Sequence, residues 1–546
     1  MIYSRKIKGV FLRLYRAYFP ERNIRDFIRH NQRIWPRADL GNARAAEILF
    51  EYNTAHSSII AFSYLANVLR DKFNAKIVAY TLNAEILLPL TQRVKQFIAR
   101  VVLPSDERRI FLSFGVQSFF SVNPTGLQLD KASRLFNEVY PLLRSKRDVE
   151  NLAIDGVWIG DLIYDTYLRK YSVPTIDVLD GKFIQFLRGS LEIFIFWQEY
   201  FDTHEVRAIN VTHCVYNNAI PLRIAVQRGI PAYQTNASHV YRMSRNNLFA
   251  YGDYRYFPVM FNKLSLREQE AGRQEARKRI DLRFSGKVGV DMRYSTKSAY
   301  GQKRNQPVLR KSSKFKVLVA AHCFFDSPHS YGNNLFPDFY EWFDFLGQVS
   351  NQTDYDWYVK THPDFLPGNI EVIQYFLNKY PKLALIDAAT SHHQLIEEGV
   401  GCVLTTYGTI GFEYAALGLL VVNASLCNPH IAYNFNLHPK SVEEYGGILR
   451  SLDTQSLKIN RAEVYEYYYM KFVRNTENWL FEDYQKMLVS LGGYAGQLTS
   501  QAYASFLGEL TEARHRQILA TMNNFVDSGD FRLNYDHMKN TPHGSS

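Results

Sequence analysis

The chain has 546 residues, of which 46% are hydrophobic and 21% charged, which is typical of globular domains and argues against bulk disorder. No stretch holds the roughly 18–20 uninterrupted apolar residues that a membrane span requires, which excludes an integral membrane protein. The N-terminal residues lack an apolar segment followed by a small-residue cleavage site, so we do not expect a secreted protein. The four cysteines are far apart and form no CxxC pair, which excludes a zinc ribbon and a disulfide scaffold and fits a reducing cytoplasm.

Positive charge is concentrated at the N-terminus. The formal net charge is +11, and the first fifty residues contribute +7, from eleven lysines and arginines against four acids. Apolar residues recur at helical spacing between residues 7 and 18, with cations around them, so residues 1–45 are predicted to hold a basic amphipathic helix. Such a helix can lie on an anionic membrane surface, or it can pack on the protein body with its cations in water. The chain has no nucleic-acid-binding motif, so nucleic acid is not expected as a partner.

Short apolar segments alternate with helix-like segments between residues 46 and 300. The predicted strands are residues 46–52, 76–82, 109–114, 152–159, 206–213 and 230–234. Amphipathic segments such as residues 57–73 and 183–201 lie between them, and a charged helix-like run follows at residues 265–282. This alternation predicts a first domain with a parallel sheet covered by helices. The polar stretch of residues 295–313 is interpreted as a linker.

A second alternating series spans residues 301–455. Its predicted strands are residues 315–321, 357–360, 383–387, 401–406 and 419–423, with helices such as residues 338–349, 370–380 and 409–417 between them. Residues 456–546 are predicted to form closing helices and a polar tail. The fold class is therefore α/β, with two Rossmann-like, doubly wound domains facing a cleft, an N-terminal amphipathic helix and C-terminal helices. In such sheets ligands bind beyond the carboxyl ends of the strands, so the loops there form the candidate site.

The loop after the first strand of the second domain holds His322, Asp326 and His329. Their spacing fits no familiar metal-ligand motif, so we expect contacts with a polar ligand, or turn chemistry alone, rather than a metal. The acidic triplet Asp354-Tyr355-Asp356 runs directly into the next strand and is interpreted as the start of that strand. The sequence therefore predicts no metal site.

Lys360 and His362 stand at the end of the next predicted strand. Pro363 ends the strand and fixes the turn, which aims His362 into the cleft. There the imidazole can donate a hydrogen bond to a phosphate or a leaving group, and Lys360 adds a positive charge. The alternative is a capped strand end with a histidine whose hydrogen bonds are satisfied locally.

The segment after residues 401–406 joins a strand to a helix that begins near Thr409. Exposed N–H groups and the positive end of the helix dipole make such a junction an anion site. Hydroxyl groups add donors, and the glutamate in the first turn can accept bonds from a ribose or only balance the helix dipole. The predicted binding residues of this segment are Thr405, Thr406, Tyr407, Thr409, Gly411 and Glu413.

The first domain offers carboxylates in residues 155–169. Gly160 and Asp161 follow a predicted strand, and if a helix starts there, Asp161, Asp165 and Arg169 share one face. This stripe can be a surface ladder of salt bridges, or it can supply a catalytic carboxylate to the cleft. Further candidates for the cleft are His213, Asn217 and Arg223.

Four of these segments occur in an order that resembles bacterial capsule and O-antigen glycosyltransferases of the GT-B architecture. They are residues 322–329, 335–340, 355–363 and 407–413. The segments are similar to those of the retaining β-Kdo transferases and of other transferases that use CMP-activated acidic sugars. The resemblance implies that Glu413 contacts the nucleotide, and that the CMP phosphate is contacted by His362, Thr405, Thr406 and Thr409.

The resemblance also implies a catalytic residue in the first domain. Asp161 stands where the capsule Kdo transferases carry an acidic motif, although Gly160 replaces the first acid and the following glycine is absent. Asp161 would be a nucleophile in a retaining reaction and the base for the acceptor hydroxyl in an inverting one. Asp165 and His362 complete the predicted catalytic set.

The function implied is that of a metal-independent glycosyltransferase that uses a nucleotide-sugar donor, CMP-linked, and no further cofactor. It would add Kdo or a related acidic sugar to a lipid-linked bacterial surface glycan, in capsule or lipopolysaccharide synthesis, on the inner face of the cytoplasmic membrane. Two alternatives stay open: an isomerase like the nucleotide-sugar 2-epimerases, which share this architecture, and a non-catalytic polysaccharide-assembly protein.

Overall fold

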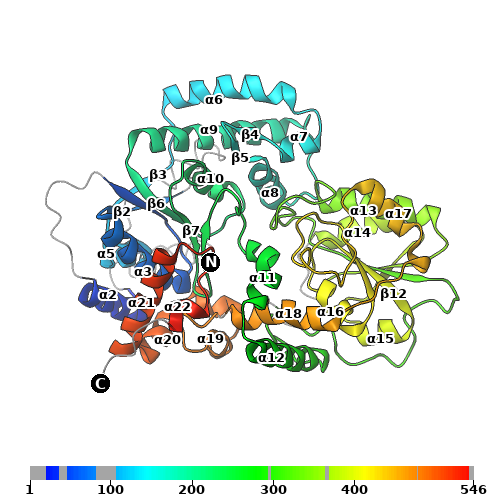
Figure 1. Cartoon of the computed structure of the whole chain (residues 1–546). Helices are drawn as coiled ribbons and strands as arrows, with labels where there is room; N and C mark the ends of the chain where they lie inside the picture. Colours follow the sequence, from blue (N-terminus) through cyan, green and yellow to red (C-terminus); the bar gives the residue numbers. More distant parts are fainter. Residues whose placement is uncertain are drawn as a thin grey trace, which may run out of the picture.

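Two β-sheets with helices packed around them form the two halves of the molecule (Figure 1). The computed structural model describes residues 20–35, 46–81, 106–292, 295, 297–362, 368–475 and 477–539. The amphipathic helix predicted around residues 7–18 lies outside these ranges and stays a prediction. Within the described ranges, no helix is both long enough and apolar enough to cross a membrane.

The first sheet is parallel except at one edge. Its strands are β1 (Glu47–Glu51), β2 (Lys76–Thr81), β3 (Val116–Ser121), β6 (Val206–Val211), β7 (Ala232–Thr235) and β8 (Val240–Met243). They lie in the order β3-β2-β1-β6-β7-β8, and β8 runs antiparallel to β7. The first strand therefore lies at the centre, with the chain passing first to one side and later to the other, as in a doubly wound sheet.

The second sheet repeats this winding with five parallel strands. They are β9 (Lys316–Ala320), β10 (Asp356–Lys360), β11 (Leu383–Ile386), β12 (Val400–Thr405) and β13 (Leu420–Asn423), in the order β11-β10-β9-β12-β13. The predicted fold class, α/β with two Rossmann-like domains, is confirmed. The domain boundaries at residues 45, 300 and 455 stay predictions.

Helices cover the faces of both sheets. Those of the first half are α2 (Arg22–Ile34), α3 (His56–Phe73), α5 (Asp106–Ser113), α6 (Gly126–Val139), α7 (Lys146–Glu150), α8 (Gly160–Tyr171), α9 (Gly181–Thr203), α10 (Ile220–Gln227), α11 (Phe257–Asn262) and α12 (Leu266–Phe284). Those of the second half are α13 (Phe339–Gln352), α14 (Asn369–Lys379), α15 (His392–Glu397), α16 (Ile410–Leu417) and α17 (Val442–Leu449).

The first C-terminal helix, α18 (Arg461–Tyr468), packs against α12 and α16. The chain then returns to the first domain, below its sheet in Figure 1, as α19 (Tyr484–Ser490), α20 (Gln501–Glu509), α21 (Glu512–Ser528) and α22 (Tyr535–Lys539). The Ser57 hydroxyl of α3 donates to the Gln497 side chain (2.9 Å), and the Lys72 ammonium donates to the Val526 carbonyl (3.1 Å). These bonds tie the C-terminal helices to the first domain, in which the described part of the chain begins.

One predicted strand is a helix. Residues 109–113 belong to α5, Phe114 follows in a turn, and none of them belongs to the sheet. A short apolar run does not distinguish a strand from a buried helix by its periodicity. Here Asp106 and Glu107 stand in the first turn, where negative charge favours a helix. The neighbouring strand of the sheet is β3, which the sequence analysis did not predict.

Residues 152–159 form a tight hairpin rather than one strand. Its strands are β4 (Ala153–Ile154) and β5 (Val157–Trp158), joined by Asp155 (φ +51°) and Gly156 (φ +73°), the positive-φ pair of a two-residue turn. Helix α8 starts directly afterwards at Gly160, where a Cβ atom would lie 2.0 Å from the Val149 carbonyl oxygen. Only glycine lets α8 begin this close to α7, and this contact places the carboxylates of α8.

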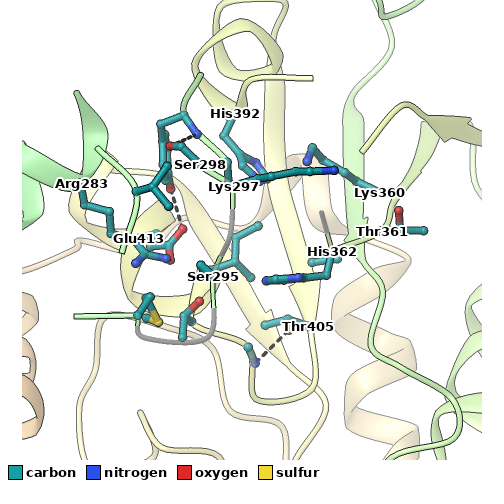
Figure 2. A pocket seen from close by; sticks show the side chains of 18 of the residues that line it. Arg283, Ser295, Lys297, Ser298, Lys360, Thr361, His362, His392, Thr405 and Glu413 are labelled. Carbon is teal, nitrogen blue, oxygen red and sulfur yellow. Dashed lines mark hydrogen bonds and ion pairs between the residues drawn. The ribbon is translucent and has the colours of Figure 1, made fainter. Parts of the chain in front are cut away.

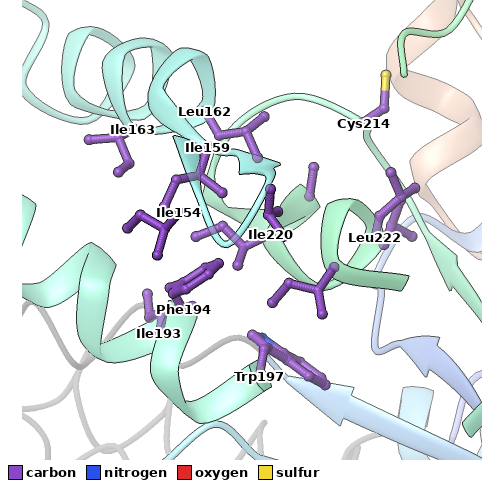
Figure 3. Packing of buried hydrophobic residues seen from close by; sticks show 14 of the residues in the cluster. Ile154, Ile159, Leu162, Ile163, Ile193, Phe194, Trp197, Cys214, Ile220 and Leu222 are labelled. Carbon is purple, nitrogen blue, oxygen red and sulfur yellow. The ribbon is translucent and has the colours of Figure 1, made fainter. Parts of the chain in front are cut away.

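Apolar packing holds α8 in place. Ile163 of α8, Trp197 of α9 and Leu222 of α10 are fully buried in one cluster beneath the hairpin (Figure 3). Full burial of side chains of this size contributes about 1.5–3 kcal/mol each. The position of Asp161 and Asp165 is therefore fixed by the apolar face of their helix.

Replacing Leu222 by alanine is expected to lower the free energy of unfolding by about 2–5 kcal/mol, because a fully buried side chain leaves a cavity. Urea denaturation followed by circular dichroism measures this. Leu266→Ala is the matched control, since Leu266 is 83% exposed and its loss should change the free energy by less than about 0.5 kcal/mol. Equal effects of the two substitutions would contradict the packing described for α10.

Candidate functional site

A cavity of about 310 Å³ lies beyond the carboxyl ends of β9, β10 and β12 (Figure 2). In the second sheet β10 lies on one side of β9 and β12 on the other. The loops that leave β9 and β12 therefore diverge, and the space between them is the crevice in which open sheets bind ligands. The position of the cavity is the one that the strand order predicts.

Positive charge dominates the lining of the cavity. Glu413 is the one carboxylate among its described lining residues, and it accepts hydrogen bonds from the Arg283 guanidinium (2.6 Å) and the Tyr300 hydroxyl (2.7 Å). Arg283 therefore balances the charge of Glu413, and the remaining cations leave the cavity positive. Such a cavity attracts an anionic ligand. Its cationic side chains are Arg283, Lys287, Lys297 and Lys360.

Lys360, the last residue of β10, is 3% exposed. Burial lowers the pKa of its ammonium to about 8, although the charges of Asp387 and Glu413 oppose this effect. The Nζ atom donates a hydrogen bond to the Ala388 carbonyl (2.8 Å). An ammonium has three donors, so an anion in the cavity can engage the others and favour the charged form.

His322 enters the cavity as a neutral imidazole. Burial lowers its pKa to about 4, with the charge of His362 acting in the same direction. The backbone N–H of Thr406 donates to its Nε2 atom (3.3 Å), so the proton of the neutral ring is on Nδ1. The ring stacks on Phe339, with the centroids 4.8 Å apart. His322 is therefore held in place as a neutral ring, and its Nδ1–H is the donor.

The junction between β12 and α16 closes the cavity on the side opposite Lys360. The backbone N–H of Gly408 donates to the Thr405 hydroxyl (3.1 Å), which makes a tight turn directly before the helix. Thr405, Gly408, Thr409 and Ile410 all line the cavity, so the first turn of α16 faces it. The N–H groups of a first helical turn have no partner within the helix and attract negative charge.

The structure brings six of the predicted binding residues together in this cavity: His322, Lys360, His362, Thr405, Thr409 and Glu413. The other five lie outside its lining. The Tyr407 hydroxyl donates to the Ser327 carbonyl (3.0 Å), and Thr406 contributes its N–H to His322. A Cβ atom on Gly411 would lie 2.5 Å from His430, so this glycine serves the packing of α16.

Asp326 lies at the edge between the two domains and is exposed. Its Oδ1 atom accepts hydrogen bonds from the Tyr216 hydroxyl of the first domain (2.8 Å) and from the N–H of Ser327 (2.9 Å). Tyr216 has φ +64° and ψ +173°, a backbone conformation that is strained for any residue with a side chain. A turn links Asp326 to Cys323, which lines the cavity.

The two predicted catalytic aspartates of α8 share one face, as predicted, and this face is buried. Asp161 forms an ion pair with Arg223 (2.7 Å), and both side chains are at most 2% exposed. Asp165 contacts the His329 Nδ1 atom (2.6 Å). Neither aspartate lines the cavity. Their catalytic role stays a prediction. In the structure each carboxylate is paired with a cationic side chain of the protein.

A buried cluster of charges joins the two domains through His329. Its Nε2 atom lies 3.1 Å from Glu150 of α7, while its Nδ1 atom contacts Asp165 of α8. Burial by itself would lower the pKa of the imidazole, but the two carboxylates outweigh it and raise the pKa to about 10. His329 is therefore an imidazolium that crosses the interface. Arg147 of α7 also donates to Glu150 and to the Asn334 carbonyl (3.2 Å).

The sequence pattern did not reveal the cations that reach the cavity from the connection between the domains. Arg283 lies in the last turn of α12, and Lys287 and Lys297 belong to the segment that follows. The polar composition of residues 295–313, which include Lys297, predicts a linker, yet the same composition suits a segment that covers an anion. The available signal was the excess of cations over acids in residues 283–297.

Metal ligands are not gathered anywhere in the part of the chain that the structure describes: no group of three histidine, cysteine or acidic side chains is placed to hold an ion. His322, Asp326 and His329 in particular point to three different partners. The predicted metal independence stays a prediction.

No protein-family model and no curated protein matches the chain. Among solved structures, the chain is similar to the beta Kdo 2,4 transferase KpsC of Thermosulfurimonas dismutans, with 13% identity over 48% of this chain and 79% of that one (TM-score 0.30). It is also similar to the UDP-GlcNAc 2-epimerase of Neisseria meningitidis bound to UDP-GlcNAc, with 10% identity over 85% and 100% (TM-score 0.20).

A third similar structure is that of trehalose-6-phosphate from E. coli bound with UDP-2-fluoro glucose, with 9% identity over 82% of this chain and 98% of that one (TM-score 0.24). With scores of 0.30 and below, these likenesses carry no argument about the site or the activity of this chain. The fold class rests on the strand orders of the two sheets, and the site rests on its own geometry.

Replacing His329 by glutamine is expected to lower the free energy of unfolding by about 3–5 kcal/mol near pH 6, because the buried Asp165 loses its cationic partner, whereas Glu150 keeps Arg147. The folded-state pKa of His329 is raised, so its stabilisation is complete below the unfolded pKa of about 6.5 and disappears as the pH rises through about 10. Urea denaturation of both proteins at pH 6, 8 and 10 measures the difference. A difference that does not shrink with pH would contradict an imidazolium at the interface.

Proposed function

We propose that this chain is a glycosyltransferase that binds the phosphate of a nucleotide-activated sugar in the cavity beyond β9, β10 and β12. The observation that carries the proposal is a cavity with an excess of positive charge, lined also by the first turn of α16, at the switch point of a doubly wound sheet. Both features favour a phosphate. The second domain would hold the donor, and the acceptor would enter from the side of the first domain.

The cavity residues can assist departure of the phosphate from the sugar. Negative charge grows on the leaving phosphate as its bond to the anomeric carbon breaks, and fixed donors stabilise that charge. Lys360, the Nδ1–H of His322 and the first turn of α16 are the donors available. We assign His362 to the same phosphate and Glu413 to the ribose hydroxyls.

We further propose that the donor is a CMP-linked acidic sugar, such as Kdo, and that the acceptor is a lipid-linked surface glycan. The sequence resemblance supports this choice of nucleotide. The charge of the cavity supports an acidic sugar, because Lys287 and Lys297 exceed the cations that one phosphate needs and can meet a sugar carboxylate.

Asp326 is the group we assign to the acceptor hydroxyl. It is exposed at the domain boundary, and its bond to the strained Tyr216 fixes its orientation toward the first domain. In the transfer step the acceptor oxygen bonds to the anomeric carbon, its proton passes to the Asp326 carboxylate, and the bonding electron pair leaves with the phosphate oxygen. Asp161, the carboxylate predicted from the sequence, can take this part only if its ion pair with Arg223 breaks.

Titration of the purified protein with CMP, CTP, UDP, GDP and ADP in a thermal-shift assay tests the donor site. A ligand at a hundredfold excess over its dissociation constant stabilises the folded state by about 2.7 kcal/mol. We expect CMP to stabilise most. In Lys360→Met the affinity should fall roughly 10- to 100-fold at pH 7, and the loss of wild-type affinity between pH 7 and 9, where Lys360 gives up its proton, should be absent.

Lys311→Met is the matched control, because Lys311 is exposed and lies outside the cavity. Stabilisation by UDP or GDP alone would keep a nucleotide site and refute the CMP assignment. The absence of a shift with every nucleotide would refute the donor site itself. Conversion of a UDP-sugar to an epimer without any acceptor would identify an isomerase in place of a transferase.

Asp326→Asn is expected to leave nucleotide affinity unchanged. With the nucleotide sugar that the wild type uses as donor, the rate of nucleotide release should fall by about 10²- to 10⁴-fold, because loss of a general base has an effect of this size. Nucleotide release is measured by coupled assay, and affinity by calorimetry. Asp161→Asn in the same assays distinguishes the contribution of Asp161 to turnover from that of Asp326. A larger loss of turnover in Asp161→Asn, with an intact fold, would assign the base to Asp161.

A further inference from the structure

Helix α2 carries a straight stripe of arginines on its exposed side. Arg22, Arg25, Arg29 and Arg33 are separated by three, four and four residues, which places them on one face of a helix. All four are exposed, and the side chains of Arg22 and Arg29 are 86% and 72% accessible. At about 1.5 Å per residue the stripe extends over roughly 16 Å.

The opposite face of α2 anchors the helix to the protein. Ile24, Phe27 and Asn31 are buried, and the ring of Phe27 stacks on Tyr503 of α20 with the centroids 4.3 Å apart. The arginines therefore stand on a rigid support at the outer edge of the first domain, away from the second domain (Figure 1). A surface that is held in this way loses little conformational freedom when it binds.

Little negative charge balances the stripe. Asp26 lies on the same face and contacts Arg22 (3.7 Å) and Arg29 (2.7 Å), so one carboxylate is shared between two guanidinium groups. The exposed face of α2 is thus a net positive strip of guanidinium groups, which bind phosphates in a bidentate manner.

We propose that the arginine stripe of α2 is a docking surface for an anionic lipid bilayer, with its guanidinium groups on the lipid phosphates. The residues before α2 favour a bilayer over a nucleic acid. Residues 1–19 add five lysines and arginines together with apolar and aromatic residues such as Phe11, Leu14 and Tyr15. Aromatic and apolar side chains next to cations partition at the lipid interface, whereas binding to a nucleic-acid backbone depends on the cations that contact its phosphates. The proposal does not depend on the transferase activity.

Vesicle sedimentation of the full chain tests the docking surface. The wild type is expected to bind vesicles of phosphatidylglycerol and phosphatidylethanolamine, not vesicles of phosphatidylcholine, and to dissociate as salt is raised. Each basic residue near an anionic surface contributes about fivefold, so loss of three cations in R25E/R29E/R33E should weaken binding by at least about 100-fold, and the new carboxylates weaken it further. Inorganic phosphate in the buffer should compete weakly, because it offers no surface.

The matched control reverses three exposed cations on α12, which also faces solvent: R267E/R277E/K278E. It changes the net charge by the same amount and is expected to weaken binding by less than about fivefold. If R25E/R29E/R33E alters the thermal midpoint, R25Q/R33Q replaces it, since these two arginines lie outside the contacts with Asp26, and a loss of about 20-fold is expected.

Three results would overturn the proposal. The first is undiminished vesicle binding by the α2 variants, and the second is an equal loss in the α12 control, which would leave only the overall net charge. The third is binding to a DNA duplex that is tighter than binding to the anionic vesicles and is lost in the α2 variants. That result would assign the stripe to a nucleic acid.

Discussion

The imidazolium of His329 is the contact on which the geometry between the two domains depends. It belongs to the loop after β9 in the second domain, and it is held by Glu150 and Asp165 from α7 and α8 of the first. A charge buried at this depth is tolerated only with its counter-ions in place, so the pair of carboxylates dictates where the loop lies. The same loop begins with His322 and continues through Asp326. The cavity and the domain boundary are therefore positioned by one ion cluster.

Burial divides the polar residues of the cavity into two kinds. The imidazole of His322 is driven to its neutral form and becomes a directed hydrogen-bond donor. Lys360 is driven only part of the way, to a pKa of about 8, and remains available as a cation. The charge of Arg283 is balanced by Glu413, so the lysines determine the net electrostatic potential of the cavity. An anionic ligand is the species that this balance favours.

The two proposed surfaces lie in different halves of the molecule. The phosphate cavity belongs to the second domain, and the arginine stripe of α2 belongs to the first, at its outer edge (Figure 1). A bilayer bound at α2 would therefore lie beside the domain that is proposed to receive the acceptor. A lipid-linked acceptor would then approach from the membrane side, while a water-soluble donor would enter the cavity of the other domain.

The sequence by itself determined the α/β class and most of the strands, because buried parallel strands are short, continuous apolar runs bounded by turn residues. It also located the cavity, since strand ends such as Lys360 and Thr405 follow directly from that pattern. It mistook residues 109–114 for a strand, because a short apolar run carries no period of its own. The tertiary structure alone decided that Asp161 meets Arg223, that His329 meets Asp165, and that the segment after α12 brings its cations to the cavity. These are contacts between residues far apart in the chain, and no local pattern encodes which distant charge a buried side chain will face.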